Sequence, residues 1–212
     1  MAWICPWSKR QPPYTESSDG FRPPKAEEMK RRFSIHIGGF HASREPAVIE
    51  TLLGSCVAVC LHDHVARIGG MNHILLPGKA DLKHFDNAAR YAINAMELLI
   101  NRIMKLGGQR PNLVAKVFGG SNVFPAVFAE NGMGAGNSEF VLEFLQMETI
   151  SIISQDLGGY DTRKIYFHTD SGEVFLKRTH PTCCRNAGFE ERRLLESARR
   201  KAEKSGDVDL FD

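Results

Sequence analysis

Residues 47–78 read AVIETLLGSCVAVCLHDHVARIGGMNHILLPG, and this stretch decides the fold class. Two apolar runs rich in β-forming residues flank a polar Asp63-His64 pair, which is typical of a β-hairpin. The sequence therefore predicts two antiparallel strands that carry the chemically reactive side chains of the chain.

The register of this hairpin decides whether Cys56 and His73 lie together. A loop of His64-Val65, or of residues 63–66, places the two residues directly opposite each other. A loop of Asp63-His64 makes them diagonal neighbours on one face, because side chains alternate with period two. Cross-strand neighbours of either kind lie within side-chain reach, so an even loop predicts a thiol beside an imidazole.

A cysteine beside a histidine is a nucleophile with its own base. The imidazole accepts the thiol proton, and the resulting imidazolium stabilises the thiolate and later protonates a leaving group. Gly54-Ser55 precedes Cys56 and lets a substrate carbonyl approach backbone N–H donors that can hold an oxyanion. Ser55, Gly54 and Asn72 are the expected oxyanion or substrate contacts.

A structural role and metal binding are two other interpretations of these residues. Free cysteine is among the most buried residue types, and Cys60 fits a purely structural role. Cys56, Cys60, His62 and His64 share one strand face and contain a His-x-His spacing that metals use. Ligands along one extended strand span too far for a tetrahedral ion, so we expect no metal and no other cofactor.

The flanking segments predict further strands and two helices. Residues 33–42 read as a strand that ends in a Gly-Gly turn, and residues 113–120 as a buried strand that runs into Gly119-Gly120. Residues 86–106 carry an apolar face at helical spacing, with Asp86 as N-cap and Gly107 after the last turn. A second helix is predicted over 137–148, capped by Asn137 or Ser138.

After these elements the pattern returns to strands. Residues 149–157 form an expected strand, and residues 162–179 a hairpin about Asp170-Ser171-Gly172. Hairpins mixed with αβ units favour an α+β fold, a layered α/β sandwich with a mixed sheet. The expected boundaries are a flexible arm over 1–32, the domain over 33–182, and a charged helix and tail over 183–212.

Composition limits the class of protein. The chain has 212 residues, 42% of them hydrophobic and 25% charged, with 27 Lys and Arg against 25 Asp and Glu. These values fit one globular domain and argue against nucleic-acid binding over a whole basic surface. Five cysteines without framework spacing, and no apolar run long enough for a membrane span, predict reduced thiols in the cytoplasm.

Four motifs in order resemble the CheD family, the chemoreceptor glutamine deamidases of bacterial and archaeal chemotaxis. They are TLLGSCVAVCLHD, GGMNHILLP, KVFGGSNVF and QDLGGYDTRKIYFHTDSGEV, within residues 34–180. The resemblance implies a fold similar to the catalytic domain of cytotoxic necrotizing factor toxins. It also implies a protein-glutamine glutaminase that converts glutamines on the cytoplasmic helices of methyl-accepting chemotaxis proteins to glutamates.

The same resemblance implies residue roles and partners. Cys56 is the nucleophile, His73 the base, and Thr51 an assisting residue. A CheC-type phosphatase is a possible second partner, and we expect a monomer. The FGGSN stretch at 118–122 is either a contact loop or a tight turn. Two other functions are weighed against deamidation: methyl-ester hydrolysis by the same Cys–His pair, and a non-catalytic adaptor that binds receptors or the phosphatase.

Overall fold

The computed structural model of the chain describes residues 30–76, 87–122 and 133–179. The chain divides after Lys30, and all elements given below belong to the second unit, Arg31–Asp212. The expected C-terminal helix, and all but the last residues of the expected N-terminal arm, lie outside the described residues. The elements are β1 (Arg31–Ser34), β2 (Phe40–Ser43), β3 (Ala47–Leu53), β4 (Val57–Asp63), β5 (Ile68–Ile74), α1 (Asn87–Lys105), the short 3₁₀-helix η2 (Arg110–Asn112), β6 (Leu113–Gly119), α2 (Met133–Met147), β7 (Ser151–Leu157), β8 (Thr162–His168) and β9 (Val174–Thr179).

The strands form two mixed sheets. The first has the order β1-β3-β8-β9, and the second has the order β2-β5-β4-β6-β7. The pairs β1–β3 and β6–β7 are parallel, and the other neighbours are antiparallel. The expected α+β fold with a mixed sheet is therefore confirmed. We refer to the four-stranded sheet as sheet A and to the five-stranded sheet as sheet B.

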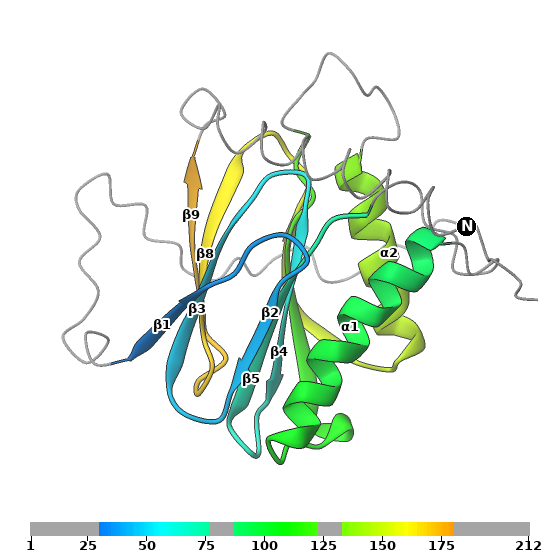
Figure 1. The fold of residues 1–212 in the computed structure, drawn as a ribbon. Helices are drawn as coiled ribbons and strands as arrows, with labels where there is room; N and C mark the ends of the chain where they lie inside the picture. Colours follow the sequence, from blue (N-terminus) through cyan, green and yellow to red (C-terminus); the bar gives the residue numbers. More distant parts are fainter. Residues whose placement is uncertain (1–29, 77–86, 123–132, 180–212) are drawn as a thin grey trace, which may run out of the picture. The chain divides into compact units, whose positions relative to one another are not determined.

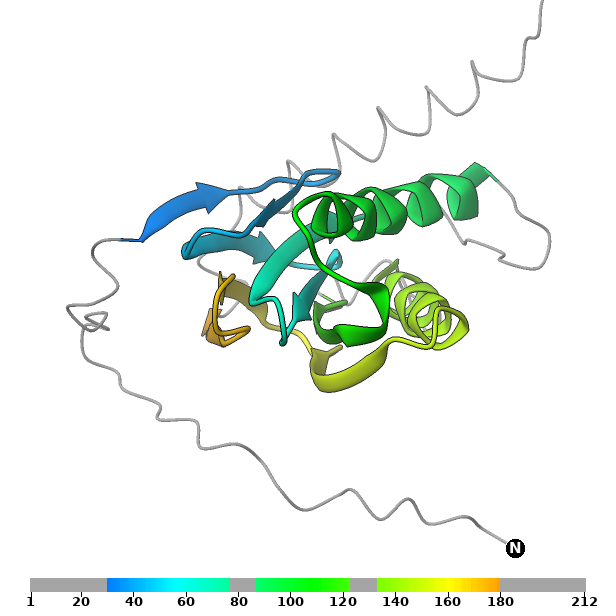
Figure 2. The ribbon, with the colours of Figure 1, turned by 90° about the horizontal axis from the view of Figure 1, so that it is seen from below.

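Sheet B is the middle layer. Both helices cover one of its faces, and sheet A covers the other (Figure 1; Figure 2). All seven residues of β4 and of β5 are buried, because both faces of these strands are covered. Along β4, Val57, Val59 and Leu61 point into the core beneath the helices, whereas Ala58 and Cys60 point into the core between the sheets. This period of two separates the two cores.

The helices confirm most of what the apolar spacing predicts. In α1, Ala89, Met96, Ile100 and Ile103 are fully buried against sheet B, and Gly107 follows the helix with a φ of 102°. The expected cap Asp86 lies outside the described residues. The second helix begins at Met133, four residues before the expected start. The predicted cap at Asn137 or Ser138 is therefore wrong, and both residues lie inside α2.

The chain passes from one sheet to the other within residues 47–63. The first apolar run of the predicted hairpin is two strands, β3 in sheet A and β4 in sheet B. Residues 54–56 connect them, and the chain crosses the gap between the layers there (Figure 1). A glycine and a serine in this link remove the bulk and the β preference that would continue the strand. The crossing places Cys56 at one end of the sandwich.

Candidate active site

Thr51 and His73 face each other across the two sheets. Thr51 lies on β3 of sheet A and His73 on β5 of sheet B, and the Thr51 Oγ1 atom is 2.7 Å from His73 Nδ1. Thr51 Oγ1 also lies 2.8 Å from the backbone oxygen of Ile35, to which it donates. Both side chains are buried. The pair thus joins sheet A to sheet B by a side-chain hydrogen bond inside the sandwich.

These two contacts determine the tautomer of His73. A hydroxyl group has one proton, and the carbonyl oxygen of Ile35 can only accept it. The Thr51 oxygen must therefore accept a hydrogen bond from His73 Nδ1–H. The lone pair of the neutral imidazole is then on Nε2, which is buried and has no hydrogen-bond partner among the described residues. His73 is held with a free basic nitrogen.

Burial keeps this imidazole neutral at ordinary pH. Desolvation is the main cause that lowers the pKa of His73 from 6.5 to about 4, and the nearby His36 contributes by charge repulsion. At pH 7 the ring is uncharged, so its nitrogen lone pair is available to accept a proton, although a pKa this low makes the resting ring a weak base.

Cys56 lies next to this histidine, in a register that differs from the predicted one. Asp63 pairs with Ile68, so the loop is the four residues 64–67, and Ala58 is opposite His73. The directly opposed register is therefore wrong. The loop length is still even, and Cys56, one residue before β4, is a diagonal neighbour of His73 on the same face. Cys56 is buried in the core between the sheets, on the side where His73 meets Thr51.

The Gly119-Gly120 pair at the end of β6 holds the loop that carries Cys56. The N–H of Gly120 donates to the carbonyl of Cys56 at 2.8 Å, and the N–H of Ser121 donates to the carbonyl of Gly54 at 2.9 Å. A Cβ atom on Gly119 would lie 2.1 Å from the Cys56 carbonyl oxygen, and the φ of Gly119 is 117°. Only glycine allows this approach. The FGGSN stretch, residues 118–122, thus holds the Cys56 loop by backbone hydrogen bonds and close packing.

Asn137 connects the same loop to the end of β5. Its Nδ2 donates to the carbonyl of Ser55 at 2.9 Å, and its Oδ1 accepts from the N–H of Leu76 at 2.8 Å. The side chain is 1% exposed. Sequence reasoning assigned this residue to a helix cap, because the early start of α2 was not visible in the pattern. An asparagine on an otherwise apolar helical face was the signal that could have identified it.

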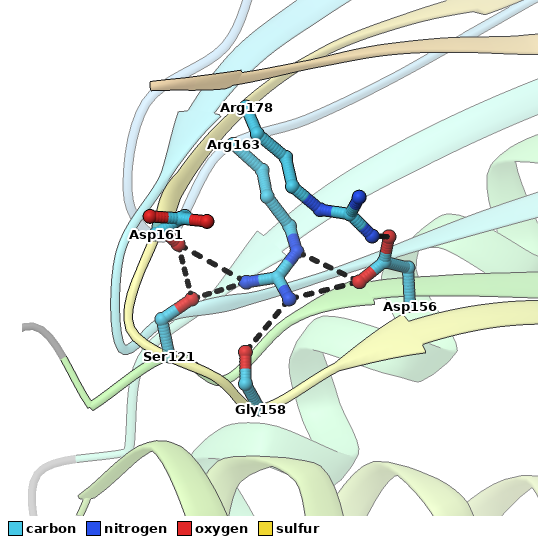
Figure 3. A network of polar contacts seen from close by, with 6 residues as sticks. All are labelled: Ser121, Asp156, Gly158, Asp161, Arg163 and Arg178. Carbon is cyan, nitrogen blue, oxygen red and sulfur yellow. Dashed lines mark hydrogen bonds and ion pairs between the residues drawn. The ribbon is translucent and has the colours of Figure 1, made fainter. Parts of the chain in front are cut away.

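A buried arginine holds the FGGSN loop in turn. The Arg163 guanidinium donates to Asp156 Oδ1, to the carbonyls of Gly158 and Asp161, and to Ser121 Oγ. Figure 3 shows Arg178 approaching the second carboxylate oxygen of Asp156 from β9. Arg163 is 4% exposed. This cluster of Ser121, Asp156, Gly158, Asp161, Arg163 and Arg178, the Arg163 network, joins the ends of β6, β7 and β8.

The structure places the remaining predicted site residues differently. Gly54 and Ser55 lie in the loop beside Cys56, and their carbonyls accept the bonds just described. Asn72 points to the opposite face of sheet B from His73. Its Oδ1 accepts from the N–H of Val59, and its Nδ2 approaches Met96 of α1. The structure therefore does not bring the Asn72 side chain to the site.

The residues of the metal alternative lie just before β4, along it and at the turn that follows it. Within residues 30–76, 87–122 and 133–179, no group of three or more His, Cys, Asp or Glu side chains is placed to hold a metal ion. Cys60 lies in the middle of β4, and burial raises the pKa of its thiol far above the usual value. His64 is exposed at the turn and bonds to the carbonyl of Asn112. Cys183 and Cys184 lie outside the described residues.

A buried thiol beside an imidazole of fixed tautomer defines a candidate cysteine hydrolase site, and comparison with known proteins gives the family. Residues 75–178 match the family model described as CheD chemotactic sensory transduction. The probable chemoreceptor glutamine deamidase CheD 1 of Shewanella oneidensis is 45% identical over 179 residues, which are 82% of this chain and 84% of that protein. The chain belongs to the CheD family.

Two further relatives extend this similarity. The probable chemoreceptor glutamine deamidase CheD of Stenotrophomonas maltophilia is 47% identical over 174 residues, 79% of this chain and 83% of its own length. The protein of the same name from a Caulobacter species is 41% identical over 189 residues, 88% of this chain and 97% of its own length.

In the part of the chain that the structure describes, no helix is long and apolar enough to cross a membrane.

Proposed function

We propose that this chain is a chemoreceptor glutamine deamidase whose nucleophile is Cys56 and whose base is His73. The observation that carries the residue assignment is the hydrogen bond from His73 Nδ1 to Thr51, which leaves Nε2 unprotonated on a ring that shares its sheet face with Cys56. The names of the relatives supply the reaction, because each is called a probable chemoreceptor glutamine deamidase. The substrate is a glutamine side chain on a receptor protein.

The first half of the reaction forms a thioester. The sulfur of Cys56 attacks the carboxamide carbon of the glutamine while His73 Nε2 takes the thiol proton. Backbone N–H groups near Ser55 and Cys56 stabilise the tetrahedral oxyanion. When the C–N bond breaks, the imidazolium returns its proton to the departing nitrogen, and ammonia leaves. Thr51 keeps the ring in the required tautomer and accepts from Nδ1–H while the ring is charged.

The second half consumes water. His73 Nε2 removes a proton from a water molecule as the water oxygen attacks the thioester carbon. The C–S bond then breaks, the thiol regains a proton, and a glutamate side chain is released. The receptor helix thereby gains a negative charge at the position of a neutral amide, which changes its electrostatic interactions with neighbouring helices.

The partners and the compartment form part of the same proposal. The substrate glutamines lie on cytoplasmic helices of chemoreceptors, so the enzyme acts in the cytoplasm, as a monomer. A CheC-type phosphatase is the second partner that the family resemblance implies. Coexpression with such a phosphatase, followed by size-exclusion chromatography with light scattering, tests both the complex and the monomer.

The decisive experiment measures conversion of glutamine to glutamate. Purified protein is incubated with the cytoplasmic fragment of a chemoreceptor, and receptor peptides are analysed by mass spectrometry together with released ammonia. We expect conversion by the parent and by Cys60→Ala, and none by Cys56→Ala or His73→Ala. The Cys60 variant is the matched control, because it removes a second buried free thiol, which lies on β4 four residues after Cys56.

Three other results would each contradict part of this proposal. Methanol released from a methylated receptor without ammonia release from an unmethylated one would establish an esterase instead. Receptor binding without either product, equal in the parent and Cys56→Ala, would establish an adaptor. Conversion that persists in Cys56→Ala would contradict the assignment of the nucleophile.

A further inference from the structure

All three carbonyl groups of the loop that carries Cys56 are held from outside the loop. Ser121 N–H binds the Gly54 carbonyl, Asn137 Nδ2 binds the Ser55 carbonyl, and Gly120 N–H binds the Cys56 carbonyl. The arrangement fixes the orientation of consecutive peptide planes beside a candidate nucleophile.

A fixed carbonyl also fixes the next N–H group. The peptide bond is planar and trans, so the N–H of a residue points opposite to the carbonyl of the residue before it. The Ser55 carbonyl points to Asn137 on α2, which covers the helix face of sheet B. The N–H of Cys56 therefore points away from α2, toward the face where Cys56 and His73 have their side chains.

We propose that Asn137 is a positioning residue that aims the backbone N–H of Cys56 at the oxyanion formed during glutamine deamidation. The inference rests on the proposed function and extends it to a residue on a different element. Asn137 acts through the Ser55–Cys56 peptide and does not itself touch the substrate. Preorganised N–H donors of this kind supply a large part of the rate enhancement in acyl transfer.

The second hydrogen bond of Asn137 adds a constraint on distance. Its Oδ1 accepts from the N–H of Leu76, three residues after His73 on the same chain segment. One amide group thus bonds to the Cys56 loop and to the segment that follows β5, the strand of His73. Both ends of the amide are used, and the side chain is fully enclosed, so it cannot rotate without losing both bonds.

The Arg163 network holds the other side of the loop. Arg163 donates to Ser121 Oγ, and the N–H of Ser121 donates to the Gly54 carbonyl. Figure 3 shows the guanidinium enclosed by Asp156, Gly158, Asp161 and Ser121. By the same planarity argument, the Gly54 carbonyl sets the direction of the Ser55 N–H. Asn137 and Ser121 together orient two successive donors.

The test separates oxyanion stabilisation from the reactivity of the thiol. Asn137→Leu keeps the side-chain volume and removes both hydrogen bonds, and Asn137→Ala is a second variant without risk of steric conflict. Ser138→Ala is the matched control on the same helix, because its hydroxyl donates within α2, to the carbonyl of Gly134, and not to the carbonyls of residues 54–56 described above. For each protein, kcat and KM for receptor deamidation are measured together with the rate at which iodoacetamide alkylates Cys56.

Alkylation is a displacement at a saturated carbon and forms no oxyanion, so it depends on the thiol and His73 alone. We expect kcat to fall ~10- to 100-fold in both Asn137 variants, because the backbone N–H of Cys56 is still present but no longer held in its orientation. KM and the alkylation rate stay at the parent values, and Ser138→Ala behaves as the parent. A lower kcat with an unchanged KM and an unchanged alkylation rate is what a positioning residue predicts.

Two results overturn the inference. One is a kcat equal to that of the parent in a folded Asn137 variant. The other is an alkylation rate that falls in proportion to kcat, which would show that the thiol itself has been displaced. A parent protein that releases no ammonia from any receptor would instead overturn the proposed function and this inference with it. The parent measurement therefore distinguishes the two failures.

Discussion

Two cysteine–histidine combinations lie on or beside β4, and they differ in almost every property that matters for chemistry. Cys56 precedes the strand and is a diagonal neighbour of His73. Cys60 lies in the middle of the strand, two residues from His62 and on the same face. Burial raises the pKa of the Cys60 thiol, and Cys60 belongs to the cluster of apolar residues between the sheets. The same residue types thus form a candidate site at one position and ordinary core at the other.

The two histidines differ in their hydrogen-bond partners. Among the described residues, both have a buried Nε2 without a hydrogen-bond partner. His73 Nδ1 bonds to the Thr51 hydroxyl, which itself is held by a backbone carbonyl. His62 lies against the turn at Gly172, and its hydrogen bond to the backbone of Asp170 offsets part of the desolvation that lowers its pKa. A side-chain partner that fixes the tautomer is what distinguishes the candidate base.

The largest expected difference concerns the two imidazoles in catalysis. His73→Gln should lower kcat for receptor deamidation by at least ~10³-fold, because it removes the general acid and base. His62→Gln should change kcat little. Steady-state ammonia release measures both. Equal losses in the two variants would mean that the contrast between the two pairs has no functional meaning.

The next effect is the pH dependence of stability. The folded pKa of His73 is about 4 against 6.5 for the free side chain, so between these values the unfolded chain binds a proton that the folded chain does not. Stability therefore falls as the pH falls from 6.5 to 4, by up to about 3 kcal/mol for this group. Urea unfolding at pH 7 and pH 4.5 measures the loss, which should be smaller in His73→Gln. An unchanged loss in that variant would assign the acid sensitivity to other groups.

A smaller effect is expected at Thr51. Thr51→Val removes the acceptor for His73 Nδ1–H, and the ring charges during the reaction, so kcat should fall ~10- to 100-fold, in line with the value of a hydrogen bond to a charged group. Thr51→Ser keeps the hydroxyl and should retain most of the activity. Nitrogen-15 NMR of the imidazole would report the tautomer directly. A Val variant as active as the Ser variant would remove Thr51 from the mechanism.

The smallest effect belongs to the other end of β4. Gly172 has a φ of 71°, and a Cβ there would lie 2.6 Å from His62 Nδ1. Gly172→Ala should therefore destabilise the protein by about 1–3 kcal/mol. Because this turn lies on the Cys60–His62 side, kcat should be unchanged. Thermal unfolding and ammonia release measure the two quantities, and a loss of kcat would show that the two ends of the strand are coupled.

Much of the fold follows from local patterns. The helical period over α1, the positive φ at Gly107 and the β8–β9 turn at Gly172 are expected from residue type alone. The shared face of Cys56 and His73 also follows, because any even loop keeps both on one face. The exact register does not, since Asp63 pairs with Ile68 and the loop moves to residues 64–67. Strand pairing depends on which residues the partner layers can bury, and that information is not local.

The candidate site is only partly a property of the motifs. Residue type and short spacing are enough to predict the loop that carries Cys56, its glycine, His73 and the strands around them, because these features are local. Long-range packing places Thr51 of another sheet against His73, brings Asn137 and Ser121 to the loop carbonyls and turns Asn72 away. The reason is that residues 54–56 carry the chain between two layers, and contacts across layers join residues far apart in sequence.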